Sequence, residues 1–311
     1  MSMETTCEIS AAAKRKKVPI AKIVTYFVLV LYTVFLFLPF LIVLFTAFKT
    51  DAEIVEMGKL SRYTLFPKEW SLEGFGMAMS TSSEYNAVNG IPSLIIGFFN
   101  SLWQTLIPLV VGLFVSAFAA FMYSKYRFPG RNTLFMITVL TMMLPLGAFG
   151  FVSYLFYVNI GWVGSKGVLA ILIPGMFGGA GTVFFLRSYF DSAISNEILE
   201  AAKIDGSNDF KIFLVMILPL AKPAIIAQFL FGFVGGYNNY AAALMYLYRD
   251  KSMWSLQLAL SELVKIGSQS EGGYVNMQCA APIMALLPHV ALYVGVQKYF
   301  IEGITIGGGK E

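Results

Sequence analysis

The chain has 311 residues, of which 57% are hydrophobic and only 13% are charged. A soluble globular domain carries about 25% charged residues, so the composition excludes an ordinary soluble domain and indicates an all-α, polytopic membrane protein. The formal net charge of +4, with no basic patch interleaved with aromatic residues, gives no indication of nucleic-acid binding. Cys7 and Cys279 are far apart and His289 is the only histidine, so neither a disulfide framework nor a metal site is expected.

The first membrane span is expected at about residues 23–48, after a polar, basic N-terminal tail at residues 1–22. An apolar run of this length can cross a bilayer with some tilt. A cleaved signal peptide is the alternative, but the run is long for one and no clear small-x-small cleavage site follows it. Residues 49–93 are polar, with interspersed aromatic residues, and predict a packed loop at the membrane interface.

Five further spans are expected at about residues 94–123, 132–158, 167–189, 221–246 and 277–300. The fourth contains Pro174 and a cluster of glycines, which predicts a bent or partly unwound helix. The apolar run at residues 212–247 is too long for one span, so we divide it at Pro219 and Pro223.

The basic residues predict the orientation. They are concentrated before the first span, between the second and third, and between the fourth and fifth. Because basic residues favour the cytoplasmic side, both termini are expected in the cytoplasm, including the tail at residues 301–311. The central parts of the first four spans contain no ionisable side chain, whereas ion-driven pumps place such groups inside the membrane. Any driving force should therefore come from outside the membrane domain, residues 23–300.

A charged segment at residues 195–211 lies between the fourth and fifth spans. As a helix it would place Glu200 and Ala201 side by side. Gly206 can adopt the left-handed conformation that ends a helix, and one of residues 207–209 can cap a second helix. The segment therefore predicts a helix–glycine–helix elbow on the cytoplasmic surface.

The elbow carries groups suited to contact with another protein. Ala201 and Ala202 are small and permit close approach, while Glu200 and Asp205 can pair with Arg or Lys. On these residues alone, a solvated amphipathic linker is an alternative interpretation.

The chain resembles a known family in four places. Glu200-Ala201-Ala202, Asp205-Gly206, Phe213 and Pro219-Leu220 with Pro223 resemble the EAA loop of binding-protein-dependent ABC importer permeases. The start of the permease core resembles Asn100-Ser101-Leu102. The end of its first helix, with the next loop, resembles Ala119-Ala120-Phe121 with Phe128-Pro129-Gly130-Arg131. The C-terminal tail of the carbohydrate branch resembles residues 299–305 with Gly309-Lys310. The resemblance covers about residues 95–311 and is to the smaller, six-span subunit of maltose-type permeases.

The resemblance implies a type I ABC importer permease fold in a prokaryotic inner membrane, with a core at about residues 95–300. It also implies a second, homologous permease, a cytoplasmic ATPase dimer that uses ATP and Mg²⁺, and an extracytoplasmic solute-binding protein that contacts the loop at residues 248–276. The elbow would be the coupling helix, with Glu200 forming a salt bridge to the ATPase. The tail residues Gly303, Gly309 and Lys310 would follow the ATPase interface. The chain has no phosphate-binding loop motif, so we expect neither its own ATPase activity nor its own cofactor.

Tyr237, Asn238 and Asn239 follow two glycines in the fifth span. Amides at this depth either line a translocation pathway for sugar hydroxyls or hydrogen-bond to the partner subunit. His289 is expected to be neutral and bonded to a neighbouring helix.

Other functions are less well supported by the residues. A non-sugar solute, such as glycerol phosphate, is an alternative cargo for the same kind of permease. A secondary transporter or channel would predict buried ionisable residues or an inverted repeat, and a membrane enzyme would predict clustered His, Asp or Glu at one membrane face. Apart from the acidic residues of the charged segment at residues 195–211, the sequence contains none of these patterns.

Overall fold

The computed structural model describes residues 20–60, 63–144, 149–269 and 274–307. Within these ranges the chain is helical, and its only β feature is an isolated bridge between Val88 and Ile91. Helices satisfy their backbone hydrogen bonds internally, which is the requirement for a chain in lipid. The all-α class expected from the composition is therefore confirmed.

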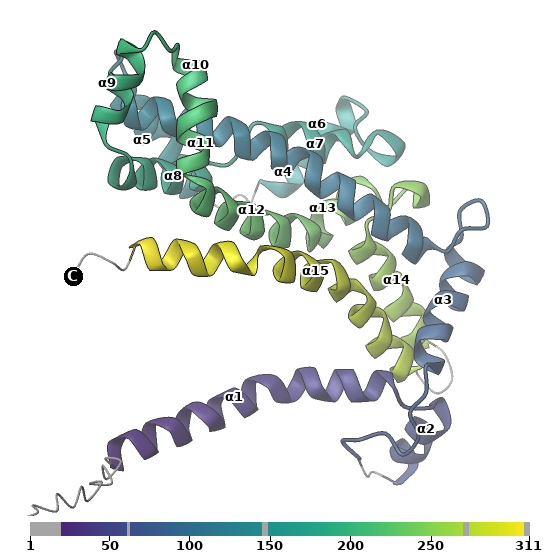
Figure 1. Cartoon of the computed structure of the whole chain (residues 1–311). Coiled ribbons are helices and arrows are strands. Elements are labelled where there is room, and N and C mark those ends of the chain that lie inside the picture. Colours follow the sequence, from purple (N-terminus) through teal and green to yellow (C-terminus); the bar gives the residue numbers. More distant parts are fainter. Residues whose placement is uncertain (1–19, 61–62, 145–148, 270–273, 308–311) are drawn as a thin grey trace, which may run out of the picture.

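The helices are named in chain order (Figure 1). The first part of the chain forms α1 (Ile20–Ala47), α2 (Asp51–Leu60), α3 (Glu73–Asn86), α4 (Ser93–Lys125), α5 (Arg131–Met142), α6 (Gly150–Asn159), α7 (Leu169–Met176) and α8 (Ala180–Ala193). The second part forms α9 (Asn196–Ile204), α10 (Asp209–Ile212), a π-helical turn (Phe213–Ile217), α11 (Leu218–Leu220), α12 (Lys222–Tyr237), α13 (Tyr240–Tyr246), α14 (Leu256–Gln269) and α15 (Val275–Gly307). Two 3₁₀ turns, Gly164–Lys166 and Lys251–Met253, precede α7 and α14.

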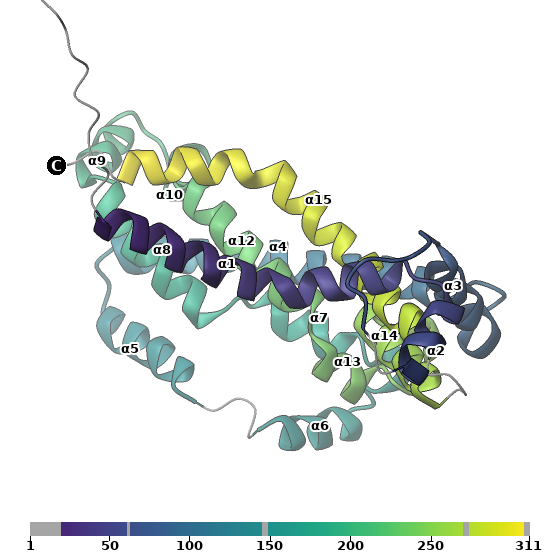
Figure 2. The same ribbon diagram turned by 90° about the horizontal axis from the view of Figure 1, so that it is seen from below.

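The molecule is elongated, and its long helices run between two ends (Figures 1 and 2). One end holds α9 and α10, together with the start of α1 and the end of α15. The other end holds α2, α3 and α14. Between the ends the chain runs back and forth through α1, α4, α5 with α6, α7 with α8, α12 with α13, and α15. The start of α1 and the end of α15 therefore lie at the same end as α9.

Four helical stretches of the described chain are long and apolar enough to cross a membrane. They are Val24–Ala47, Ser93–Lys125, Gly164–Ala193 and Val275–Gly295, and the bent pair Asp209–Leu220 with Lys222–Tyr237 would make a fifth. The span expected at residues 132–158 is instead divided into α5 and α6, of 12 and 10 residues, each too short to span alone. The chain is a multi-pass membrane protein, and six spans stays a prediction.

The fourth expected span is broken, as the proline and glycines predict. Helix α7 ends at Met176 and α8 begins at Ala180, with Gly178 at φ +81° between them. A Cβ on Gly178 would lie 2.1 Å from Ser116 Oγ of α4, and the same hydroxyl accepts a hydrogen bond from the Gly179 N–H at 3.1 Å. At the break, α4 therefore packs directly against the backbone of this span.

The fifth expected span begins after a sharp bend. The segment before the bend and α12 meet at 79°, and Ala221 is the residue between them. Pro219 and Pro223 flank this position, which confirms the division made from the sequence.

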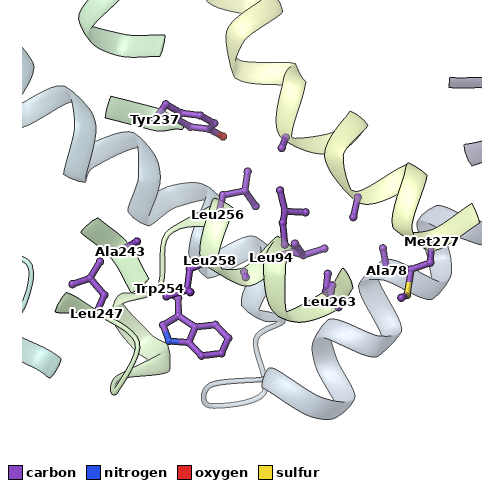
Figure 3. Close-up of a cluster of buried hydrophobic side chains, with 14 of the residues drawn as sticks. Ala78, Leu94, Tyr237, Ala243, Leu247, Trp254, Leu256, Leu258, Leu263 and Met277 are labelled. Atoms are coloured by element: carbon purple, nitrogen blue, oxygen red, sulfur yellow. The ribbon is translucent and has the colours of Figure 1, made fainter. Parts of the chain in front are cut away.

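A hydrophobic core fills the end of the molecule that holds α3 and α14 (Figure 3). Its labelled members are Ala78, Leu94, Tyr237, Ala243, Leu247, Trp254, Leu256, Leu258, Leu263 and Met277. They come from α3, α4, α12, α13, α14, α15 and the segment before α14, so this core joins distant parts of the chain. By contrast, most side chains of α1 are apolar and exposed, as suits a helix surrounded by lipid or by another membrane protein.

Buried polar side chains of α4 hold the segment before α14. Asn100 Nδ2 donates to the carbonyl oxygens of Ser252 and Trp254 at 2.8 and 3.0 Å. Ser101 Oγ accepts a hydrogen bond from the Leu256 N–H at 2.8 Å. These bonds satisfy backbone groups that would otherwise be buried without a partner.

A buried lysine joins the end of α1 to the following loop. Lys49 is fully buried; its Nζ donates to the carbonyl oxygen of Thr64 and lies 4.5 Å from the centroid of the Tyr63 ring. Glu53 is also buried and accepts a hydrogen bond from the Thr64 hydroxyl at 3.2 Å. Burial lowers the pKa of Lys49, and the Glu53 carboxylate opposes that shift. The interfacial loop expected from the sequence is thus a packed structure.

Candidate functional site

The elbow predicted around Gly206 is present. Helix α9 ends at Ile204 and is followed, after Asp205, by Gly206 at φ +76°, whose N–H bonds to the carbonyl of Lys203 at 3.0 Å. The Ser207 N–H bonds to the carbonyl of Ala202, also at 3.0 Å. This pair of bonds is the Schellman arrangement, which satisfies helix-end carbonyls and requires a left-handed residue. The backbone at position 206 therefore favours glycine.

The second helix of the elbow is capped by Asn208, whose Oδ1 accepts a hydrogen bond from the Lys211 N–H at 2.7 Å. Lys203 Nζ lies 3.4 Å from Asp209 Oδ1 across the turn, with both side chains about half exposed. An exposed pair of this kind contributes at most about 1 kcal/mol. Burial, with the nearby Asp209 carboxylate, raises the pKa of Tyr126 beneath the elbow. The elbow is thus fixed mainly by its caps and by burial.

The inner face of the elbow packs against its own chain. Leu199 and Ala202 are only 6% and 5% exposed, and they share a core with the fully buried Phe213. The Phe213 ring stacks on that of Phe121 with centroids 5.5 Å apart. Ala202 therefore supports the elbow from within, which corrects the expectation that it is open to close approach by another protein.

The outer face of the elbow is exposed and partly apolar. Glu200 and Ala201 lie on it, as expected, and so does Asp205. Ile204 is 86% exposed and Phe210 is 51% exposed, which is high for such large apolar side chains. The sequence interpretation missed both, although Ile204 follows Glu200 by four residues and so shares its helix face.

The elbow is fastened to the ends of α4 and α8. Lys125 Nζ, at the end of α4, donates to the carbonyl oxygen of Ile194, the residue after α8, at 2.6 Å and lies 3.4 Å from Asn196 Oδ1 at the start of α9. Ser124 Oγ donates to Asp191 Oδ1 at 2.5 Å, which ties α4 to α8 just before the elbow. A displacement of the elbow would consequently be passed to α4 through Asn196 and to α8 through the chain that joins α8 to α9.

A cavity of about 710 Å³ lies between α1 and the group α13, α14 and α15. Its lining residues are Phe40, Val43, Leu44, Asn238, Tyr240, Gln257, Leu260, Ser261, Val264, Pro282, Ile283, Ala285, Leu286 and His289. Of the three residues proposed from the sequence for a translocation pathway, this cavity is lined by Asn238 alone.

Asn238 is the centre of a chain of hydrogen bonds in this cavity. Gln257 Nε2 donates to Asn238 Oδ1 at 3.0 Å, and Asn238 Nδ2 lies 3.2 Å from His289 Nε2. The expectation that His289 bonds to a neighbouring helix is confirmed, because Asn238 directly follows α12. The other ring nitrogen, His289 Nδ1, is buried and has no partner among the described residues.

The other two residues proposed for a translocation pathway, Tyr237 and Asn239, contribute to the fold and do not line this cavity. Tyr237 is 1% exposed and lies in the hydrophobic core (Figure 3), and its hydroxyl has no hydrogen-bond partner among the described residues. Asn239 caps α13, since its Oδ1 accepts a hydrogen bond from the Ala242 N–H at 3.1 Å. It also borders a smaller cavity of about 230 Å³ between α4, α7 and α12.

The expected C-terminal tail at residues 301–311 is described as far as Gly307. Gly303 belongs to α15, which continues to Gly307 beyond the boundary expected at residue 300. Gly309 and Lys310 lie outside the described residues. The same holds for residues 1–19, most of the expected N-terminal tail.

A bundle of apolar helices, with a capped and exposed elbow at one end and a cavity between its helices, has the architecture of a membrane permease subunit. The chain belongs to the family described as binding-protein-dependent transport system inner membrane components, whose model matches residues 112–304. The matched region includes the elbow, the cavity residues of α13, α14 and α15, and Gly303.

Curated relatives of the chain are also permeases. It is 29% identical to the arabinooligosaccharides transport system permease protein AraQ of Bacillus subtilis, over 92% of this chain and 94% of the relative. It is 31% identical to the osmoprotective compounds uptake permease protein GgtD of Synechocystis, over 68% of this chain and 70% of the relative. A chain in the crystal structure of a bacterial ABC transporter that imports alginate has the same fold, with a TM-score of 0.75, 24% identity and coverage of 90% and 96%.

Proposed function

We propose that this chain is the smaller permease subunit of an ABC importer and forms half of the pathway for a sugar or oligosaccharide. It pairs with a second, homologous permease and rests on a cytoplasmic ATPase dimer, which supplies the energy from ATP and Mg²⁺. An extracytoplasmic binding protein delivers the solute. The type I fold then has six spans, with both termini in the cytoplasm.

The observation that carries this proposal is the elbow. Its inner face is buried in the chain's own core, while Glu200, Ala201, Ile204 and Phe210 are exposed at one end of the molecule. An exposed apolar patch with a carboxylate at its edge is suited to docking in a cleft that has a basic group. Because the elbow is bonded to α4 through Asn196 and Lys125 and follows directly on α8, closure of the ATPase dimer would move these helices as rigid bodies.

The positions of the described chain ends support the proposed topology. The start of α1 and the end of α15 lie at the same end as the elbow (Figures 1 and 2). If the elbow faces the cytoplasm, both termini do so as well. An interrupted third pass, α5 with α6, completes six crossings.

The relatives support a carbohydrate as the cargo, because AraQ is described as a permease for arabinooligosaccharides. GgtD, described as a permease for osmoprotective compounds, supports a second candidate, a small non-sugar solute. Both cargoes would use the same elbow and the same partners.

The Glu200→Ala variant tests the proposal. The complete importer is reconstituted in proteoliposomes, and ATP-dependent uptake is measured together with ATPase activity. Loss of one charge-assisted contact costs about 1.5–3 kcal/mol. We therefore expect docking to weaken roughly 10- to 100-fold, with uptake lost although the chain is inserted normally.

Glu84→Ala is the matched control, because Glu84 is an exposed carboxylate at the opposite end of the molecule. This variant should transport like the wild type. Normal uptake and normal stimulation of the ATPase by Glu200→Ala would contradict the role of the elbow.

A further inference from the structure

We propose that the 710 Å³ cavity is a binding site in this subunit for an uncharged, polyhydroxylated solute. We call it the polyol site and define it by Asn238, Gln257, Ser261, His289 and, on the opposite wall, Phe40. The inference rests on the proposed function and makes it more specific. It assigns direct contact with the cargo to this chain.

The walls of the polyol site differ in character. Asn238, Gln257, Ser261 and His289 bring amide, hydroxyl and imidazole groups to one side, where they lie among apolar side chains such as Leu260, Val264 and Ile283. Phe40 and its neighbours on α1 bring only hydrocarbon to the other side. Sugars have the matching division, with hydroxyl groups at the ring edge and C–H groups on the ring face. A lipid chain offers no hydrogen-bond partners to these polar groups, and burying polar groups without such partners is unfavourable.

The polar wall has hydrogen-bonding capacity to spare. A carboxamide has two donor hydrogens and an oxygen with two lone pairs. The bonds of Asn238 to Gln257 and His289 hold its amide in place and use only part of that capacity. The amides of Asn238 and Gln257 are therefore oriented in advance and can exchange hydrogen bonds with hydroxyls, which both donate and accept.

The described lining residues include no Asp, Glu, Lys or Arg. An anionic sugar would lose its hydration there without gaining a counter-charge, which is strongly unfavourable. A neutral sugar loses less hydration free energy, and hydrogen bonds to the amides and the hydroxyl compensate for that loss. The site should consequently discriminate against uronic acids and phosphorylated solutes.

The polyol site lies between two candidate membrane spans, Val24–Ala47 and Val275–Gly295. His289 is fourteen residues from the start of α15 at Val275, or about 21 Å along the helix axis. The volume also falls in the usual range for small-molecule sites, about 300–1,000 Å³. This depth suits a site that a solute occupies during passage.

A cysteine reporter tests the inference. Ser261→Cys is introduced in a Cys7→Ser, Cys279→Ala background, and the complete importer is reconstituted. Labelling of the new thiol by a small maleimide is followed with maltotriose, arabinotriose or raffinose present, and separately with trigalacturonate. We expect at least one neutral probe to slow labelling about threefold or more, as an occupied pocket excludes the reagent, and trigalacturonate to have no effect.

Two further variants show whether the protection depends on the polar wall. Adding Asn238→Leu should abolish it. Gln228→Leu, which removes an amide from a separate cavity of about 290 Å³, should preserve it. Co-purification with the partner subunits shows that each variant is assembled.

Three outcomes would overturn the inference: no protection by any neutral probe, equal protection by trigalacturonate, or a reporter that is reactive in the isolated chain and blocked in the complex without sugar. The last would show that the partner permease fills the cavity.

Wild-type uptake separates a failure of the polyol site from a failure of the proposed function. If the wild type imports a neutral probe with ATP and binding protein, only the polyol site is rejected; if it imports none, the sugar-import function is rejected too.

Discussion

Gly206 and Asn238 illustrate how single residues control the two candidate sites. Gly206 sets the direction of the elbow through its backbone, since a Cβ there would contact no atom within 4 Å. Asn238 acts through its side chain, which joins Gln257 to His289. Substitutions at position 206 therefore report on backbone conformation alone, whereas those at position 238 report on hydrogen bonding.

At the residue scale we predict that Gly206→Pro inserts in the membrane but abolishes uptake. Proline fixes φ near −65°, far from the observed +76°, and it removes the N–H that bonds to Lys203. Gly206→Ala should cost only about 1 kcal/mol and lower uptake partially. ATP-dependent uptake and ATPase activity in proteoliposomes measure the difference.

Gly206→Asn is the control, because asparagine tolerates the left-handed conformation better than other residues. It should retain more activity than Gly206→Ala. The opposite order, or full activity of Gly206→Pro, would show that the turn is not needed for coupling.

At the scale of elements, α4 organises the bundle. It packs against the broken α7–α8 span, forms the base of the elbow through Lys125, and holds the segment before α14 through Asn100. These contacts lie along one continuous helix of 33 residues. A change at the elbow and a change near α14 are thus connected by a single rigid element.

Asn100→Ala should destabilise the protein by about 1–3 kcal/mol, because it leaves one buried and one partly buried carbonyl group of the segment before α14 without their donor. Thermal unfolding of the detergent-solubilised protein would show a lower Tm. Asn132→Ala, at an exposed position near the start of α5, should leave the Tm unchanged. Equal Tm values for Asn100→Ala and the wild type would contradict the structural role of this amide.

At the scale of the whole molecule, the arrangement separates two tasks. The end with the elbow presents an exposed apolar and acidic surface, and the opposite end contains the tightly packed core of Figure 3. The 710 Å³ cavity adjoins the packed end, where α13 and α14 contribute to its wall. The site proposed for energy input and the site proposed for the cargo are therefore distinct and joined by long helices.

The topology gives a whole-molecule prediction that centres on the interrupted third pass. Alkaline phosphatase, which is active only outside the cytoplasm, should be active when fused after Glu84 or after Gly161 and inactive when fused after Gly130. A fluorescent protein fused to the C-terminus should fluoresce. An inactive fusion after Gly161 would show that α5 and α6 do not cross the membrane together, and the number of spans would then be wrong.

The sequence by itself determined the features that depend on local chemistry. Its apolar content predicted a helical membrane protein, the prolines predicted the division before α12, and Gly206 predicted the turn of the elbow. For the cap of its second helix the sequence offered Ser207, Asn208 or Asp209, of which the structure uses Asn208. Such features follow from neighbours in the chain, because caps and turns are satisfied within a few residues.

Tertiary structure decided the rest, since burial depends on which distant segments meet. It placed Ala202 and Tyr237 in packed cores, left Ile204 exposed, and brought Gln257 and His289 to Asn238 from separate helices. Helical periodicity assigns a residue to a face but cannot state what covers that face. The elbow could therefore be predicted from its own residues, whereas the cavity exists only because α1, α13, α14 and α15 converge.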